Sequence, residues 1–130
     1  MRFHTRKIVS YVDLNPNGTL FGGRLLEWID EEAALYAILQ LGNNKVVTKS
    51  MSEIDFVSPG NLGDIVEIGV EVIKFGNTSL SLKCEARNKM TKQVIISVDK
   101  ITMINLGEDG KPEVHGKTTV TFGKDRDYSK

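Results

Sequence analysis

The sequence predicts an α+β domain in which one long central helix is wrapped by a curved antiparallel β-sheet of five to six strands. Only one stretch, residues 23–41, combines good helix formers with a broad apolar face. Most of the remaining chain alternates apolar and polar residues with the period of two that is typical of strands. The connections between these strands are short and turn-like, which favours antiparallel neighbours.

The helix follows an expected N-terminal strand over residues 2–12 and a turn at residues 15–18, which read NPNG. It is expected to end at Leu41, because Gly42 suits a C-terminal cap. At about 100° per residue, its apolar side chains span an arc of roughly 220°, which is wider than the stripe of an ordinary surface helix. The sheet is therefore expected to surround the helix on most sides.

Four strands are expected after the helix, over residues 45–57, 64–74, 78–87 and 93–106. In the last of them the alternation changes phase beyond Val98, which predicts a β-bulge near Asp99–Lys100. Cys84 lies on the apolar side of its strand and is expected in the core.

Length and composition limit the classes of function. The 130 residues suit one domain, assigned to residues 1–122, with residues 123–130 as a flexible tail. A formal net charge of zero gives no surface suited to nucleic acid or to an anionic membrane. The single cysteine excludes an internal disulfide and a multi-cysteine zinc site, so no metal is expected. Without a membrane span or a signal peptide, the expected compartment is the cytoplasm.

An acid inside the apolar arc of the helix is the strongest chemical clue. Asp30 falls between Ala37 and Leu41 on the helical wheel, apart from the other acids. Burial disfavours the charged form of a carboxyl group, which suits a general base or nucleophile that works near neutral pH. The residues alone leave a structural role open, either at a subunit interface or hydrogen-bonded in the core.

Paired glycines, Gly22 and Gly23, precede this acid. Glycine at a helix start lets a ligand approach the backbone, and the N–H groups there stabilise developing negative charge. Asp30 lies seven residues beyond Gly23, which is about two helical turns. One carbonyl group could meet both only if the acid comes from a neighbouring chain or if the substrate lies along the helix.

Several spaced motifs share one order. Residues 15–34 read NPNGTLFGGRLLEWIDEEAA, and VVT (46–48), FxxP (56–59), GD (63–64), GxTS (76–79) and VDKITMINLGEDGKP (98–112) follow. Together they resemble the hot-dog-fold acyl-CoA thioesterases, and more narrowly the bacterial YciA-type hydrolases related to brain cytosolic acyl-CoA hydrolase. The resemblance runs from about residue 9 to residue 112. The combination is fairly specific, whereas each motif alone is weak.

The resemblance implies that two subunits pair their sheets edge to edge and bind acyl-CoA at the interface, commonly in a trimer of dimers. It implies that Asp30 is the catalytic acid and that Gly23, with Gly22 beside it, polarises the thioester carbonyl. It implies no cofactor, since coenzyme A is part of the substrate and the product.

The resemblance also implies substrate contacts, with two departures from the family pattern. Thr19 stands where relatives have Asn or Asp, so Asn17 is a candidate substitute. Asn77 stands where many relatives have Arg in the turn, which leaves Lys74, Arg87 or Lys89 to contact the CoA phosphates. The other expected substrate-binding residues are Phe21, Gly76, Thr78 and Ser79.

Two other functions stay open. A hot-dog dehydratase or hydratase would use a histidine paired with an acid, but no histidine lies near the FGG motif. A non-catalytic acyl-CoA-binding module of the regulator type would need an added DNA-binding domain, for which this length leaves no room. The remaining expectations are surface or structural roles for His4 and His115, a solvated Glu31–Glu32 pair, and Trp28 packed against a loop or a partner.

Overall fold

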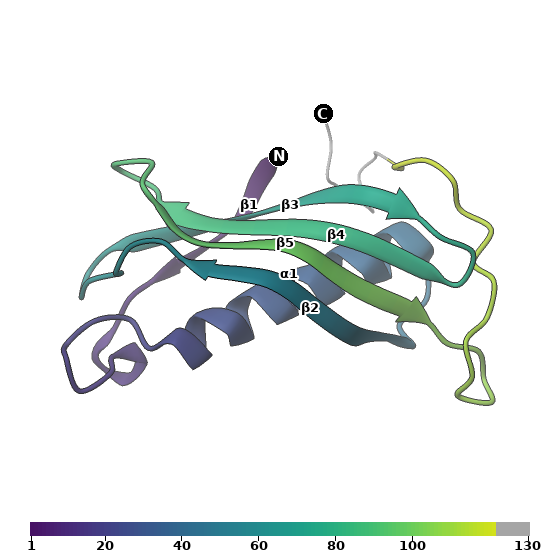
Figure 1. Ribbon diagram of the computed structural model, residues 1–130, viewed down its shortest axis with the longest axis horizontal. Coiled ribbons are helices and arrows are strands. Elements are labelled where there is room, and N and C mark those ends of the chain that lie inside the picture. Colours follow the sequence, from purple (N-terminus) through teal and green to yellow (C-terminus); the bar gives the residue numbers. More distant parts are fainter. Residues whose placement is uncertain (122–130) are drawn as a thin grey trace.

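The computed structural model describes residues 1–121 and consists of one long helix packed against a five-stranded antiparallel sheet (Figure 1). The helix α1 spans Gly22–Leu41. The strands are β1 (Arg2–Ile8), β2 (Val46–Phe56), β3 (Ile65–Phe75), β4 (Ser79–Asn88) and β5 (Val94–Asn105). The predicted fold class is confirmed. The predicted tail, residues 123–130, lies outside the described residues.

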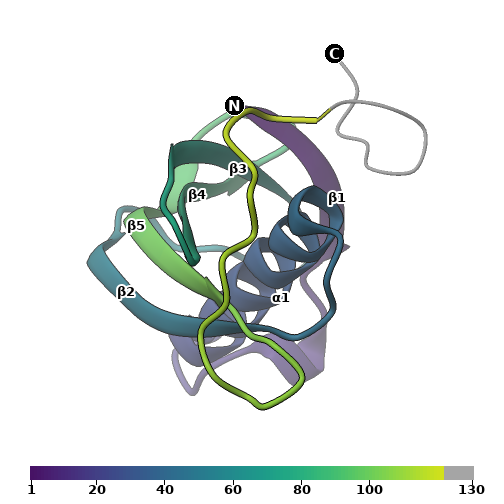
Figure 2. The same cartoon turned by 90° about the vertical axis from the view of Figure 1, so that its right-hand side faces the viewer.

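The sheet curves around the helix and leaves two edges. The strand order is β1-β3-β4-β5-β2, and every neighbouring pair is antiparallel. Viewed along α1, the sheet wraps from β2 on one side to β1 on the other (Figure 2). Alternate residues of β4 face the helix and are fully buried, which is the periodicity that the sequence predicts. They are Leu80, Leu82, Cys84 and Ala86.

The predicted bulge in the last strand is confirmed. Leu82 of β4 faces Ile101 of β5, and Cys84 faces Val98, so β5 carries one extra residue at Asp99–Lys100. The helix end is also confirmed, because Gly42 caps α1 with a φ of 67°, in the left-handed region that glycine favours.

The N-terminal strand is shorter than predicted, since β1 ends at Ile8 and a 3-10 helix, η1 (Tyr11–Asp13), follows. The Asp13 carboxylate accepts hydrogen bonds from the backbone N–H and the hydroxyl of Ser10, both at 2.9 Å. This local capping box offers the backbone an alternative to the strand. The predicted strand character of residues 9–12 is therefore wrong.

The buried face of α1 is rotated relative to the prediction. Trp28 and Glu32 are only 9% and 3% exposed, whereas Ala34 and Ile38 are half-buried. The expectation of a solvated Glu31–Glu32 pair is therefore wrong for Glu32, although Glu31 is exposed. Trp28 lies in the hydrophobic core of its own chain. A wide apolar arc leaves the rotation of a helix undetermined, because several orientations bury similar area.

A C-terminal segment, residues 113–121, crosses the end of the molecule where α1 ends (Figure 2); we call it the strap. The buried Gln40 amide exchanges two 2.8 Å hydrogen bonds with the backbone of Thr121. His115 Nε2 lies 2.8 Å from the Ser79 carbonyl oxygen, and His115 Nδ1 accepts from the Lys117 N–H at 2.9 Å. The structural role expected for His115 is confirmed. No helix of the described residues is both long and apolar enough to cross a membrane.

Cys84 is expected to be unreactive in the native protein. It is fully buried, and burial, followed by the charges of Glu32 and Asp30, raises the pKa of its thiol to about 12. The thiolate is the reactive form, so a chromogenic disulfide reagent should label this residue only after unfolding in guanidinium. The absorbance of the released thiol measures this. One rapidly reacting thiol per native chain would contradict the packing.

Candidate active site

Asp30 lies on the side of α1 that faces the edge strand β2. The hydroxyl of Thr48 on β2 donates a 2.6 Å hydrogen bond to Asp30 Oδ1. Asp30 is half-buried and lies on the helical wheel between Ala37 and Leu41, which are both buried, so its predicted place within the apolar arc is confirmed. It lies toward the border of that arc, because Ala34, on the other side of Leu41, is only half-buried. A substrate can therefore reach the carboxylate from the open edge of the sheet.

The sequence did not single out Thr48 as a site residue. Its hydroxyl holds one oxygen of the acid, and a hydrogen bond to a charged acceptor is stronger than one between neutral groups. Thr48 and Asp30 are 18 residues apart in the chain, so neither helical nor strand periodicity relates them. The only signal was the VVT motif, which marks the start of β2.

The start of α1 forms the second part of the candidate site. Phe21 is the N-cap residue and makes no side-chain capping bond, so within residues 1–121 no capping side chain covers the first N–H groups of the helix. These groups and the helix dipole favour a negatively charged oxygen. This arrangement suits the carbonyl oxygen of a thioester as charge develops on it.

Two aromatic rings flank the paired glycines. A Cβ atom added at Gly22 would lie 3.2 Å from the ring of Phe56, and one at Gly23 would lie 2.8 Å from the ring of Phe21. A hollow of about 340 Å³ beside Gly22 is lined by Phe56 and Pro59. Another of about 360 Å³ borders Gly23 and Phe21. The glycines thus permit close packing of the rings as well as close approach of a ligand.

The acid and the helix start are not brought together within one chain. Gly23 and Asp30 lie on the same face of α1, because seven residues make nearly two whole turns. The same spacing separates them by about 10 Å along the helix axis. A single carbonyl group cannot contact both in one chain.

Residues 17–95 match the thioesterase superfamily, and this range contains Gly22, Gly23, Asp30 and Thr48. The chain belongs to this superfamily.

Three known proteins illustrate the similarity of this thioesterase to its family. An uncharacterized acyl-CoA thioester hydrolase of Buchnera aphidicola is 31% identical over 106 residues, which cover 77% of this chain and 78% of the relative. A hexameric thioesterase of Yersinia pestis is 27% identical, with a TM-score of 0.80 over 87% of this chain and 93% of that one. The acyl-CoA hydrolase of Staphylococcus aureus, solved with butyryl coenzyme A, coenzyme A and coenzyme A disulfide, is 31% identical, with a TM-score of 0.77 over 85% of this chain and 66% of that one. The predicted hot-dog fold is confirmed.

Asn17 and Thr19 of this thioesterase belong to the turn that precedes α1. The side-chain oxygen of Asn15 accepts hydrogen bonds from the backbone N–H groups of Asn17, at 2.9 Å, and Thr19, at 3.1 Å. Asn17 is exposed at the tip of this turn, while Thr19 is half-buried. Both shape the entry to the helix, and their predicted contact with substrate stays a prediction.

The GxTS turn lies at the other end of the sheet from the start of α1. The Gly76 N–H donates to the Ser79 carbonyl oxygen at 2.9 Å, and Asn77 and Thr78 form the tip between β3 and β4. Lys74, near the end of β3, is beside this turn. Arg87 is at the opposite end of β4 and forms an ion pair with Glu67. Arg87 therefore lies away from this turn within one chain, and its predicted contact with a CoA phosphate stays a prediction.

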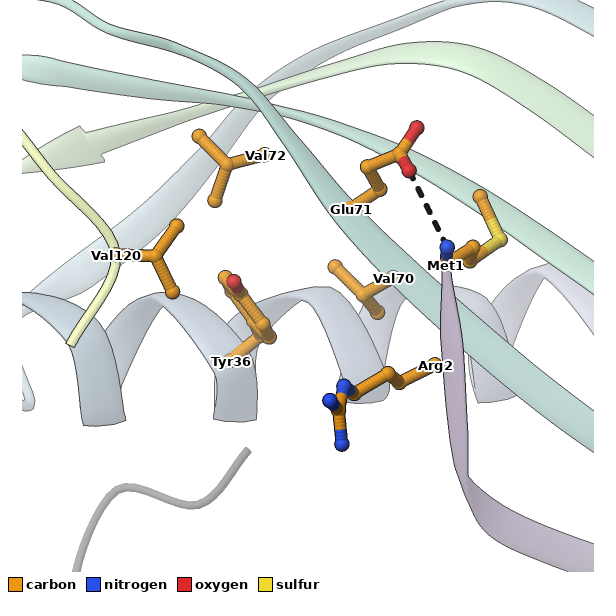
Figure 3. A pocket seen from close by; sticks show the side chains of 7 residues that line it. All are labelled: Met1, Arg2, Tyr36, Val70, Glu71, Val72 and Val120. Atoms are coloured by element: carbon orange, nitrogen blue, oxygen red, sulfur yellow. Dashed lines mark ion pairs between the residues drawn. The ribbon is translucent and has the colours of Figure 1, made fainter. Parts of the chain in front are cut away.

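A cavity of about 200 Å³ lies between α1 and the strands β1 and β3 (Figure 3). Tyr36 faces Val70 and Val72 of β3 there, and the Met1 ammonium lies 3.3 Å from a carboxylate oxygen of Glu71. This cavity does not join the site at β2. Among residues 1–121, no group of three or more His, Cys, Asp or Glu side chains could hold a metal ion.

Proposed function

We propose that this thioesterase hydrolyses acyl-CoA to a carboxylic acid and coenzyme A, at a site that two copies of the chain share. One observation carries the proposal. Asp30 and Gly23 lie on the same face of α1 but are too far apart to meet one carbonyl group, and Asp30 lies beside the open sheet edge β2. The Staphylococcus aureus relative, solved with butyryl coenzyme A, supports the substrate class.

The open edge β2 supports a homodimer. Among the described residues it pairs only with β5, and its exposed apolar side chains include Val47, Ile54 and Phe56, at 45%, 39% and 54% exposure. An exposed apolar edge strand is a template for pairing with another chain. A two-fold dimer is self-complementary, so antiparallel pairing of two β2 strands centred on Ser52 places Thr48 of each opposite Phe56 of the other.

This pairing would bring the acid and the helix start of two different chains together in one site. Thr48 holds Asp30, and the ring of Phe56 packs against Gly22, so the acid of one copy faces the helix start of the other. The N–H groups at that helix start would polarise the thioester carbonyl. As general base, Asp30 would take a proton from a water molecule whose oxygen adds to the carbonyl carbon; the C–S bond then breaks and the sulfur leaves as the thiol with that proton. As nucleophile, Asp30 would displace the coenzyme A thiolate and form a mixed anhydride, which water then hydrolyses to the carboxylic acid and free Asp30 while the thiolate takes up a proton from water.

The placement of the histidines favours hydrolysis over hydration or dehydration of the acyl chain. His4 lies on β1, the edge opposite to β2, and His115 is held by the Ser79 carbonyl oxygen. The described part of the chain thus places no histidine beside Asp30, whereas the hydratase mechanism would pair one with the acid.

A trimer of dimers is the assembly we infer for the whole protein. The hexameric Yersinia pestis relative supports it, because a two-fold pairing of β2 produces only a dimer and a hexamer needs a second contact. Sedimentation of the purified protein measures this directly. The cytoplasm stays the predicted compartment.

Hydrolysis of a series of acyl-CoA esters of different chain length tests the proposed activity. Release of the CoA thiol can be followed with a chromogenic disulfide reagent, against which Cys84 is expected to be silent. We expect catalytic release with each enzyme molecule turning over many times. Binding of acyl-CoA without turnover would instead establish the non-catalytic alternative.

Thr48→Val should lower kcat by about tenfold to a hundredfold, since it removes a hydrogen bond to a charged group, worth roughly 1.5–3 kcal/mol. The branched shape of the side chain is retained, so thermal unfolding should change little. Thr48→Ser, which keeps the hydroxyl, is the matched control and should retain most activity. A wild-type kcat for Thr48→Val would show that the hydroxyl does not position the acid.

A further inference from the structure

A group of cations surrounds one buried carboxylate on the face of the sheet that points away from the helix. Glu67 of β3 is 3% exposed, and its neighbours Val66 and Ile68 face the core. Glu67 Oε1 accepts hydrogen bonds from Arg87 Nε at 2.6 Å and from Lys92 Nζ at 3.2 Å. Burial acts to raise the pKa of Glu67, but the bonds and charges of these two cations outweigh it and lower that pKa.

The cations outnumber the acid that holds them. Lys89 neighbours Lys92, and the side-chain contact with Lys92 and the charge of its ammonium lower the pKa of Lys89. Arg6 of β1 is the partner of Glu67 in the register of β1 and β3, and its positive charge also lowers the pKa of Lys89. One carboxylate therefore stands among four cations, in a chain whose formal net charge is zero. We call Arg6, Arg87, Lys89 and Lys92 the cation cluster.

Two members of the cation cluster are held in place by contacts of their own. The guanidinium of Arg87 stacks 3.7 Å from the centre of the Phe3 ring. Lys92 has a φ of 67°, a left-handed conformation that is unfavourable for lysine, and its N–H donates to the Asn88 carbonyl oxygen at 2.8 Å. The fold thus fixes closely spaced positive charges that repel one another, which an anion would relieve.

The cation cluster lies at the same end of the sheet as the start of α1 (Figure 1). The turn that carries Lys89 and Lys92 leads directly into β5, and the first residues of β5 are hydrogen-bonded to the segment that follows β2. The Val57 N–H donates to the Ile95 carbonyl oxygen at 2.8 Å. Ile95 and Phe56 both line the hollow beside Gly22. A ligand whose thioester lies at the helix start can therefore extend around this end of the sheet.

We propose that the cation cluster binds the phosphates of the nucleotide part of coenzyme A; the identity of the ligand rests on the function proposed above. A phosphate monoester carries close to two negative charges and several strong acceptors, which matches the excess of positive charge. Arg87 presents a planar fork of donors, and the lysines add point charges. Glu67 then acts as a positioning residue, because it orients Arg87 and Lys92.

Direct binding tests the site without relying on catalysis. Adenosine 3′,5′-bisphosphate, the nucleotide fragment of coenzyme A, would be titrated calorimetrically into the wild type and into Lys89→Gln/Lys92→Asn. Asparagine at position 92 tolerates the left-handed backbone. We expect Kd to rise about tenfold or more in the double variant, with a weaker dependence on salt. Lys100→Gln, which changes an exposed lysine of β5 outside the cluster, should bind like the wild type.

Inorganic phosphate and kinetics complete the test. A nucleotide site would be overturned if the wild type bound inorganic phosphate as tightly as it binds the bisphosphate. It would also be overturned if the double variant and the wild type bound the bisphosphate equally tightly. In the active enzyme, the double variant should raise KM for acyl-CoA about tenfold and leave kcat and the KM for an acyl-pantetheine unchanged. The wild type could bind the bisphosphate, and the double variant could fail to bind it, while neither protein hydrolyses acyl-CoA. That result would support the phosphate site and contradict only the proposed activity.

Discussion

Asp30→Asn should lower the turnover of acyl-CoA by about two orders of magnitude or more, the scale on which removal of a general base acts. The amide oxygen can still accept the hydrogen bond from Thr48, so the geometry should be preserved while the basic group is lost. Steady-state hydrolysis measures kcat, and sedimentation with thermal unfolding checks that the assembly and the fold are retained.

Glu31→Gln is the matched control for this variant. It removes the same charge from the next residue of α1, where the side chain is exposed. Its activity should stay within about twofold of the wild type, because exposed charges far from the reacting atoms are screened. Near wild-type hydrolysis by Asp30→Asn would contradict the assignment of the acid.

Ile54→Lys should dissociate the dimer and reduce hydrolysis about a hundredfold at assay concentration. Ile54 is 39% exposed on the open edge β2, so the isolated chain tolerates a lysine there. In the paired edge the ammonium would lose water without gaining a partner, and lysine on an edge strand opposes pairing. Each site then loses either its acid or its helix start. Sedimentation velocity and hydrolysis, measured over the same range of concentration, test both effects.

Leu62→Lys is the control, because Leu62 is 43% exposed and precedes β3 rather than lying on β2. It should leave both the dimer and its activity intact. A fully active monomer of Ile54→Lys would contradict the shared site.

The local structure followed from the sequence where a short stretch of chain determines it. Gly42 ends the helix because it adopts a left-handed conformation, and the change of phase in β5 marks the bulge at Asp99–Lys100. The ends of β2 to β5 were each predicted to within one residue. These features depend on neighbours in the chain, and the pattern of residues reports them.

Features that depend on contacts between distant segments were not predicted. The wheel placed Glu32 outside the buried face, because periodicity gives angles about the helix axis but not the side on which the sheet lies. Thr48 meets Asp30 across 18 residues of chain, and no spacing rule relates a strand to a helix. Lys74 and Arg87 were both candidates for the CoA phosphates, but the length of β4 separates Arg87 from the GxTS turn beside Lys74.

Recovery of activity on mixing two inactive variants tests the shared site most directly. Asp30→Asn keeps the helix start, while Gly23→Val keeps the acid and places a side chain over the N–H groups. Gly23→Val should fold, because the added atom meets the half-exposed ring of Phe21, which can turn away. Each variant alone should be nearly inactive. If they are unfolded and refolded together, half of the dimers are mixed and each mixed dimer has one intact site of two, so about a quarter of wild-type activity should return. A mixture no more active than its separate components would contradict a site built from two chains.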